Sequence, residues 1–272
     1  YKRQGLELGS VWMKLGAEVE VIEYLDHILP GMDKEVSDSF HKILKRQGVK
    51  FNLSSKVNSV KNDGNKAIIE FEKDGTNHNL EADAVLVCVG RKPNTDGLKL
   101  DTIGVEQDEK GRVKIDKNFK TNVKNVYAIG DVVVGPMLAH KAEEEGIAVV
   151  EMISGKYGHV NYDVIPNVVY THPEIASVGK TEEELKKQSI EYNVGKFPFM
   201  ANSRAKVNDE ADGFVKILAD KKTDKVLGVH IVGPDAGNLI AELSLAMEFG
   251  ASSEDIARTC HAHPTLTEAI KE

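Results

Sequence analysis

The sequence predicts an α/β protein: part of an open, mostly parallel sheet with helices, followed by an α+β unit with an antiparallel sheet. Three observations lead to this prediction. The chain opens with a helix pattern that runs into a strand pattern, glycines stand near the start of that helix, and short strand and helix patterns follow one another after residue 162. Helix, strand and glycine in this order are typical of part of a Rossmann-like nucleotide-binding domain.

Each element of the first part has a local signal. Apolar residues recur at helical spacing over residues 5–16, and alternation then predicts a strand over 17–24. A second helix is expected over 33–47, with Gly48 as its stop. The apolar run 84–89 is expected to form a buried parallel strand. Between them we expect short strands at 49–53, 57–61 and 67–72, joined by turns.

The elements of the later parts follow the same logic. Strands are expected at 112–115 and 126–129, and a helix at 142–153. Thr181 and Glu184 form a capping box that starts a helix. The remaining α+β unit is expected to have strands at 168–170, 176–178, 192–197, 214–218 and 226–232, and helices at 182–188, 236–249 and near the C-terminus. We therefore expect three parts: residues 1–91, 92–161 and 162–272.

Composition and patterning argue against several kinds of partner. The net charge is −8 with both signs mixed along the chain, and no basic stripe suited to nucleic acid appears. No apolar run reaches the roughly 18 residues that a membrane-spanning helix needs, and no signal-peptide pattern opens the chain. The two cysteines, Cys88 and Cys260, match no metal-ligand spacing and are expected to be reduced thiols. We therefore expect no nucleic acid, membrane or metal partner.

A dinucleotide site is indicated near the start of the chain. Gly5 stands where a G-x-G-x-x-G loop has its last glycine, although Lys2 occupies the place of another. Glu23 ends the next strand, about 20 residues after the glycine loop, where an acidic side chain binds the ribose hydroxyls of NAD. A 2′-phosphate would be repelled there. A solvated acid at a strand end is the alternative interpretation of Glu23.

The most specific stretch runs from Thr121 to His140. An apolar strand is expected to end at Gly130 and Asp131, where glycine permits close approach of a ligand and a carboxylate suits sugar hydroxyls. A helix then opens, and its N-terminal backbone N–H groups suit an electron-rich ring edge. Its first residues are Met137, Leu138, Ala139 and His140. Taken alone, Asp131 could equally cap a turn.

This stretch resembles the second FAD-binding motif of the pyridine nucleotide–disulfide oxidoreductases. Within that family, the segments 135–143, 196–205 and 261–268 are most similar to the dihydrolipoamide dehydrogenases. The resemblance implies a homodimeric flavoenzyme that oxidises protein-bound dihydrolipoamide through an active disulfide and FAD, with NAD as the acceptor. It further implies lipoyl domains of 2-oxoacid dehydrogenase complexes and of the glycine cleavage system as partners, in the mitochondrial matrix or a bacterial cytoplasm.

The resemblance also implies roles for single residues. Asp131 would bind the ribityl chain of FAD, and Met137 to His140 would meet the flavin ring. The NAD site would comprise Gly5, Glu7, Glu23, Val57 and Gly90. His263 would be the catalytic base, since an imidazole can take a proton from a thiol near neutral pH. Glu268 would fix the tautomer of His263 and stabilise the imidazolium.

The chain departs from the family pattern in two respects. The first FAD fingerprint and the closely spaced redox cysteines of the family are not found, and Tyr1 to Gln4 do not match a glycine-rich strand end. We expect an N-terminally truncated chain that does not complete the catalytic cycle by itself. One alternative is a non-catalytic dimerisation or binding module. Another is a related enzyme such as glutathione reductase, against which Glu23 argues.

Overall fold

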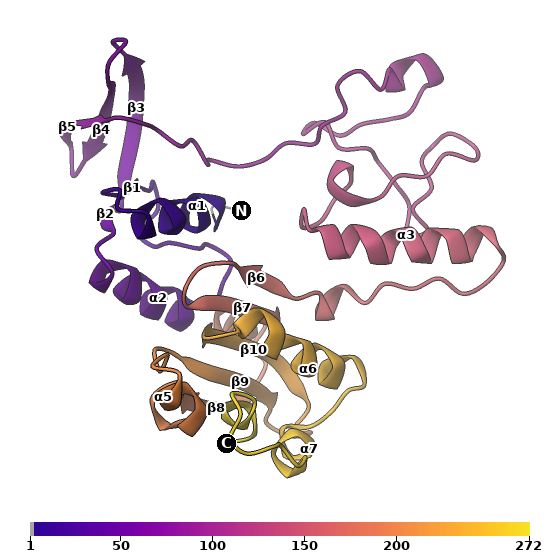
Figure 1. Cartoon of the computed structure of the whole chain (residues 1–272). Coiled ribbons are helices and arrows are strands. Elements are labelled where there is room, and N and C mark those ends of the chain that lie inside the picture. Colours follow the sequence, from indigo (N-terminus) through magenta and orange to yellow (C-terminus); the bar gives the residue numbers. More distant parts are fainter. Residues whose placement is uncertain (1–2) are drawn as a thin grey trace. The chain divides into compact units, whose positions relative to one another are not determined.

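The computed structural model describes residues 3–272, and the chain divides into two compact units (Figure 1). Unit 1 joins the residues up to Val89 with Asp163–Glu272, and unit 2 is Gly90–Tyr162. The first and third of the three expected parts therefore pack together as one unit. The division into three domains stays a prediction.

The centre of unit 1 is a five-stranded antiparallel sheet with the strand order β6-β7-β10-β9-β8. All five strands coincide with expected ones to within two residues. Their bounds are β6 Asn167–Val169, β7 Glu174–Gly179, β8 Tyr192–Pro198, β9 Phe214–Asp220 and β10 Val226–Gly233. The structure thereby confirms the predicted antiparallel sheet of the C-terminal part.

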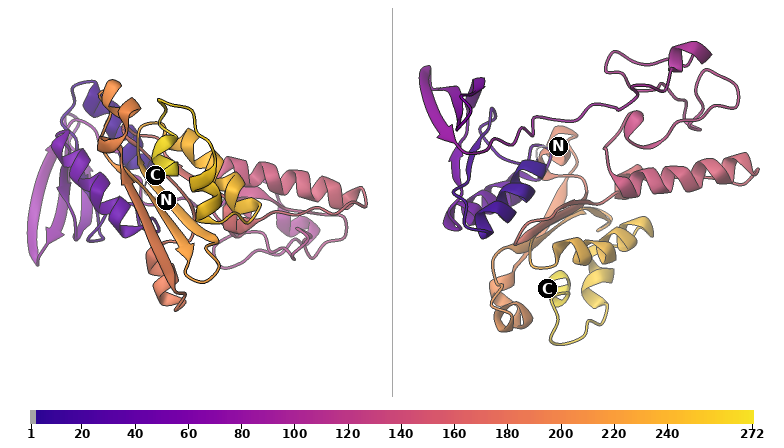
Figure 2. Two further views of the ribbon diagram at one scale, coloured as in Figure 1. Left: turned by 90° about the horizontal axis from the view of Figure 1, so that it is seen from below. Right: turned by 45° about the horizontal axis from the view of Figure 1, so that its top comes forward.

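Helices cover both faces of this sheet, so its inner strands β7, β10 and β9 are buried on both sides, whereas the edge strand β8 is mostly exposed (Figure 2). Along β10, Ile231 belongs to the core beneath α6 (Ala236–Glu248), whereas Val232 belongs to the core beneath α1 (Arg3–Lys14) and α2 (Lys34–Arg46). Successive strand residues point to opposite faces, which explains this alternation. Burying side chains such as Phe40, which is fully buried in α2, contributes about 1.5–3 kcal/mol each.

Side chains at the N-cap position begin two helices of unit 1. Thr181 accepts a hydrogen bond from the N–H of Glu184, and the Glu184 side chain accepts one from the N–H of Thr181, which confirms the capping box. Asp33 caps α2 through one bond of this kind, in which its carboxylate accepts from the N–H of Glu35. The short helices of unit 1 are α4 Glu182–Lys187, which starts at this capping box, α5 Ser203–Val207, α7 Ser253–Arg258 and α8 Glu268–Lys271.

The part of unit 1 before Gly90 is built on two small sheets. In one, β1 (Glu20–Ile22) pairs in parallel with β2 (Lys50–Asn52). In the other, β3 (Ser55–Asn62), β4 (Ala67–Lys73) and β5 (Thr76–Ala82) form an antiparallel meander. The sequence analysis missed β5 because its sequence, Thr-Asn-His-Asn-Leu-Glu-Ala, carries almost no apolar residue, and its burial pattern is mostly exposed.

The expected strand over residues 84–89 is wrong, because no strand of the described chain pairs with this segment. Val87 and Val89 are 68% and 83% exposed. The segment does lie against α1, since a Cβ on Gly5 would be 3.4 Å from the Cβ of Cys88. A strand is stable only when its backbone groups bond to a neighbour, and an apolar composition alone does not supply one.

Unit 2 contains one long helix, α3 (Ala139–Ile153), as expected, and mostly irregular backbone before it. The expected strands at 112–115 and 126–129 are wrong: each is reduced to a single bridge, Gln107 to Val113 and Lys120 to Tyr127. Their apolar residues nevertheless form two small cores with neighbouring loops. No helix among residues 3–272 is long and apolar enough to cross a membrane.

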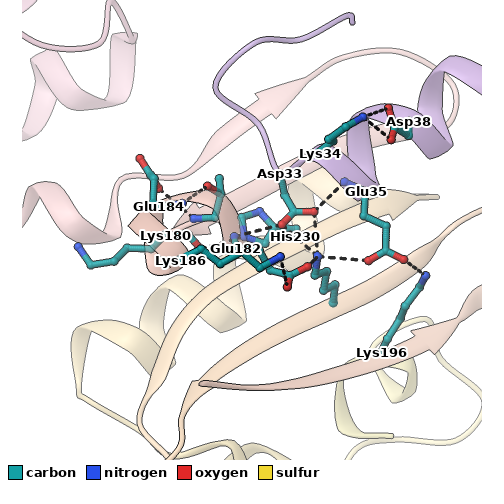
Figure 3. A network of polar contacts seen from close by, with 12 residues as sticks. Asp33, Lys34, Glu35, Asp38, Lys180, Glu182, Glu184, Lys186, Lys196 and His230 are labelled. Atoms are coloured by element: carbon teal, nitrogen blue, oxygen red, sulfur yellow. Dashed lines mark hydrogen bonds and ion pairs between the residues drawn. The ribbon is translucent and has the colours of Figure 1, made fainter. Parts of the chain in front are cut away.

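A buried group of charged side chains joins α2 to the antiparallel sheet (Figure 3). Lys216, on β9, is completely buried; its Nζ lies 3.0 Å from both carboxylate oxygens of Asp33 and 2.6 Å from Oε2 of Glu182. Glu35 is the third acid, at 3.2 Å from Nζ. His230 stands opposite Lys216 in the strand register and is itself buried. We call Asp33, Glu35, Glu182, Lys216 and His230 the buried charge cluster, after its buried members Asp33, Lys216 and His230; the side chains of Glu182 and Glu35 are 20% and 43% exposed.

The buried charge cluster predicts how stability responds to acid. Burial lowers the pKa of His230 below its ordinary 6.5, so its contribution to stability is lost as the pH falls below that value. Burial alone raises the pKa of Glu182, but hydrogen bonds from Lys216, Tyr192 and Lys186 lower it to about 2. The stability that Glu182 contributes is therefore present above its ordinary pKa of 4.5 and lost as the pH falls towards about 2.

We therefore expect urea denaturation at several pH values to show a free energy of unfolding that declines below neutral pH and again below pH 4.5. Lys216→Met is expected to weaken the second decline, because Glu182 loses its principal cation. If the free energy of unfolding depends on pH equally in the unmodified chain and in the variant, Lys216 does not contribute to the stability that ionised Glu182 provides.

Candidate functional site

The structure brings His263 and Glu268 together in unit 1. His263 lies in the loop between α7 and α8, and Glu268 is the first residue of α8. His263 Nδ1 is 2.8 Å from Glu268 Oε1, and the other carboxylate oxygen accepts the N–H of Thr265 at 2.9 Å. In the tautomer that donates from Nδ1, Nε2 is the nitrogen that can accept a proton. The His263 side chain is 71% exposed, so this nitrogen can meet a substrate.

The charge of Glu268 suits it to support His263. The backbone N–H of Thr265, and then the hydrogen bond with His263, lower the pKa of Glu268 below its ordinary value. A carboxylate that stays ionised stabilises the imidazolium that forms when the histidine takes a proton. The pair is thus able to act as a general base with an orienting acid.

The neighbouring His261 has a different environment. Its side chain is only 5% exposed, its Nε2 is 2.7 Å from Glu242 Oε1 on α6, and its Nδ1 is 2.9 Å from the carbonyl oxygen of Thr259. Both ring nitrogens are engaged within the protein. His261 therefore anchors the loop to α6, while His263 is the histidine open to a reaction partner.

The residues expected at a dinucleotide site are divided between the units. Glu23 follows β1, and its backbone bonds to Asn52 at 2.8 Å and to Ser55 at 2.9 Å, which fixes it beside the start of β3, the strand that carries Val57. One carboxylate oxygen of Glu23 accepts the N–H of Leu25 at 2.9 Å. Gly5 lies on α1 of the same unit, whereas Gly90 belongs to unit 2.

Glu7 has a partner within the protein. Its Oε1 accepts the backbone N–H of Tyr170, just beyond β6, at 3.0 Å. Arg3, on the same helix, donates to the carbonyl oxygen of Val168 at 2.8 Å. These contacts tie α1 to the edge of the antiparallel sheet, so Glu7 has a structural contact besides the NAD contact expected of it.

In unit 2, the turn that precedes α3 presents Asp131. Gly130 has a φ of +73°, a conformation that favours glycine, and a Cβ there would lie 3.1 Å from the Cβ of Ala142. The Asp131 side chain is 51% exposed and lies 3.6 Å from the guanidinium of Arg91. Arg91 also donates to the carbonyl oxygen of Met137. The sequence analysis missed Arg91, whose only signal was its place just after an apolar run.

The residues from Met137 to His140 lead into α3, which begins at Ala139. Leu138 is buried, while Ala139 and His140 are exposed at the first turn. A ligand edge at this point would meet backbone N–H groups and the positive end of the helix dipole. The bare backbone at Gly130, the exposed carboxylate of Asp131 and this helix start fit a sugar-alcohol chain attached to an electron-rich ring.

Among the described residues, no group of three or more His, Cys, Asp and Glu side chains is arranged to hold a metal ion.

Comparison with known proteins adds independent information. Residues 4–146 match the family model described as pyridine nucleotide-disulphide oxidoreductase, and residues 165–272 match its dimerisation domain. The chain is 61% identical to dihydrolipoyl dehydrogenase 2, mitochondrial, of Arabidopsis thaliana, over 98% of this chain and 53% of that protein. It is 58% identical to the Dictyostelium discoideum mitochondrial dihydrolipoyl dehydrogenase, over 98% of this chain and 56% of that protein. The chain thus spans about half the length of the curated relatives it matches.

Solved structures are similar over almost the whole chain. LpdA from Mycobacterium tuberculosis matches with a TM-score of 0.91 and 27% identity, over 99% of this chain and 58% of that one. The HOCl-induced flavoprotein disulfide reductase RclA from Escherichia coli matches with a TM-score of 0.90 and 26% identity, over 98% of this chain and 61% of that one. The sequence and the fold therefore agree that this chain belongs to the pyridine nucleotide-disulphide oxidoreductase family and carries the dimerisation domain of that family.

Proposed function

We propose that this chain supplies the proton-transfer, dinucleotide and part of the flavin sites of a dihydrolipoamide dehydrogenase. The observation that carries the proposal is the His263–Glu268 pair, an imidazole held by an ionised carboxylate at 2.8 Å, in the part that matches the dimerisation domain. The identity of 61% to the Arabidopsis dihydrolipoyl dehydrogenase supports the choice of this enzyme within the family.

The chemistry requires such a base. A dithiol is mostly protonated at neutral pH, since a free thiol has a pKa of about 8.5, and only the thiolate attacks a disulfide. Nε2 of His263 would take this proton, while Glu268 holds Nδ1 and offsets the charge of the imidazolium. FAD supplies the two-electron relay from the dithiol to NAD when it is bound.

The turn at Gly130 supports FAD as the ligand of unit 2, because it combines bare backbone with the exposed carboxylate of Asp131. Asp131 would accept hydrogen bonds from the ribityl hydroxyls, and Met137 to His140 would lie along the ring. In unit 1, Glu23 would accept hydrogen bonds from the ribose hydroxyls of NAD beside β3. The family's dimerisation domain supports a homodimer, in which His263 would serve the disulfide of the partner subunit.

The partners and location proposed for the enzyme rest on its relatives. Lipoyl domains of 2-oxoacid dehydrogenase complexes and of the glycine cleavage system carry the dithiol that such a site would oxidise. The Arabidopsis and Dictyostelium relatives are named as mitochondrial, which supports the mitochondrial matrix as the compartment.

The test uses the complete enzyme, meaning this chain together with the further length that its curated relatives have. A flavin absorption spectrum and the reduction of NAD by dihydrolipoamide are expected. A complete enzyme without flavin, or one that does not reduce NAD with this substrate, would refute the proposal. The chain by itself is expected to bind FAD poorly, because it supplies only part of the proposed flavin site.

The choice of NAD over NADP is expected to depend on Glu23. Replacing Glu23 with Ala and introducing an arginine nearby should raise kcat/KM for NADP relative to NAD. The carboxylate that repels a 2′-phosphate is then gone, and a cation is present in its place. Steady-state rates with both coenzymes measure the ratio. Glu20→Ala, three residues earlier on the exposed start of β1, is the matched control and should leave the ratio unchanged. An unmodified enzyme that is faster with NADP would contradict the assignment of Glu23.

A further inference from the structure

Two charged side chains of α3 that the proposed reaction does not use are buried in unit 2. The side chains of Lys141 and Glu145 are 0% and 1% exposed, and Lys141 Nζ lies 3.0 Å from Glu145 Oε1. Burying an ion pair costs several kcal/mol per ion, which the mutual attraction offsets only with good geometry and further hydrogen bonds. The further hydrogen bonds of this pair therefore indicate what it holds in place.

Both side chains hold the same residue, Gly130. The N–H of Gly130 donates to Glu145 Oε2 at 2.7 Å, and its carbonyl oxygen accepts from Lys141 Nζ at 3.1 Å. One peptide group on each side of Gly130 is thus fixed by a charged partner. Hydrogen bonds to charged groups are roughly twice as strong as neutral ones, so the turn is held at its left-handed φ of +73°.

Two neighbours complete this arrangement. Gly135 leaves room for the lysine, since a Cβ there would lie 3.0 Å from Cε of Lys141. Tyr162 donates from its hydroxyl to Glu145 Oε1 at 2.8 Å, which fixes the carboxylate from the other side. Asp131 is the next residue after the clamped one, and its side chain is half exposed at the surface.

We propose that Glu145 and Lys141 are positioning residues for the flavin, which hold the backbone of Gly130 so that the Asp131 carboxylate meets the ribityl hydroxyls. The inference rests on the proposed function, and it adds that FAD affinity depends on a buried ion pair beneath the site. Because both side chains are buried, each would act on the cofactor only through the peptide groups of Gly130 that it holds.

The test measures the dissociation constant of FAD by titrating the apoprotein of the complete enzyme and following flavin fluorescence. Glu145→Gln and Lys141→Met are each expected to weaken FAD binding by about 10- to 100-fold, the range for losing a hydrogen bond to a charged group. The double variant should bind FAD more tightly than Lys141→Met alone, because it leaves no uncompensated buried charge and keeps an acceptor for the N–H of Gly130.

The matched control is Lys216→Met, which also breaks a buried ion pair but in unit 1. It is expected to lower stability and to leave the FAD dissociation constant unchanged, which separates positioning from general destabilisation. Should Glu145→Gln fail to fold, Tyr162→Phe removes only the hydroxyl and should weaken FAD binding by about 3- to 10-fold.

The outcomes are distinct. FAD bound with unchanged affinity by Tyr162→Phe and by the folded variants at 141 and 145 overturns this inference and leaves the proposed function standing. An equal loss of affinity in Lys216→Met also overturns it. An unmodified complete enzyme that binds no FAD overturns the proposed function and this inference together.

Discussion

Replacing His263 with glutamine is expected to slow dihydrolipoamide oxidation by about 10²–10⁴-fold, the usual contribution of general-base catalysis. Glutamine keeps a hydrogen-bonding side chain of similar size but cannot take the proton of a thiol. Glu268→Gln is expected to cost less, because the imidazole remains while its orientation and charge support weaken. Both effects are measured as kcat/KM for dihydrolipoamide in the complete enzyme.

The control for this prediction is electron transfer from NADH to an artificial acceptor. That reaction involves no thiol and should survive both substitutions. His261→Gln provides a second comparison, since His261 is bonded at both nitrogens and buried against α6. Dithiol oxidation near the unmodified rate in His263→Gln would refute the role of the base, and equal loss of both activities would assign His263 to folding.

Replacing Lys216 with methionine is expected to lower the free energy of unfolding by about 3–5 kcal/mol, the cost of removing one partner from a buried ion pair. Asp33 is completely buried and would keep its charge without the cation that now lies 3.0 Å from both oxygens. The double variant Asp33→Asn with Lys216→Met should lose less than Lys216→Met alone, because the completely buried side chain at position 33 no longer carries an uncompensated charge.

Urea denaturation of the chain measures these differences, with Lys34→Met as the control. Lys34 is the first residue of α2, the helix that Asp33 caps, and its Nζ lies 2.7 Å from Oδ2 of Asp38. Both of these side chains are exposed, and exposed ion pairs contribute about 0–1 kcal/mol. If Lys216→Met and Lys34→Met destabilise the chain equally, the buried charge cluster contributes no more than a surface pair.

Local signals predicted the elements that local interactions determine. The capping box at Thr181 and the helix α2, with Gly48 after it, are set by neighbouring residues. The strands of the antiparallel sheet were predicted from apolar segments, each of which also has a pairing partner in the structure. The apolar run 84–89 failed as a prediction because a strand depends on a pairing partner elsewhere in the sequence, and composition does not specify one. The polar β5 failed for the converse reason: its partner β4 makes it a strand.

The same distinction applies to the candidate site. His263 and Glu268 lie five residues apart on one loop and helix start, and the structure brings them into contact. Lys216 and Asp33 are separated by 183 residues, so no spacing rule could pair them. Lys141 and Glu145 stand at helical spacing, which usually indicates an exposed pair, and only their burial reveals that they hold Gly130.

The contact of Asp33 with Lys216 has a consequence for how the chain comes apart. Unit 1 is made of two stretches of sequence that Gly90–Tyr162 separates, and α2 shares a buried core with the antiparallel sheet. Proteolytic cleavage near residues 90 and 162 would cut the chain into three fragments, of which the first and the last belong to the same unit. These two fragments would stay associated through the contact of Asp33 with Lys216 and through their shared apolar core, so a cut between them in the sequence would not separate them.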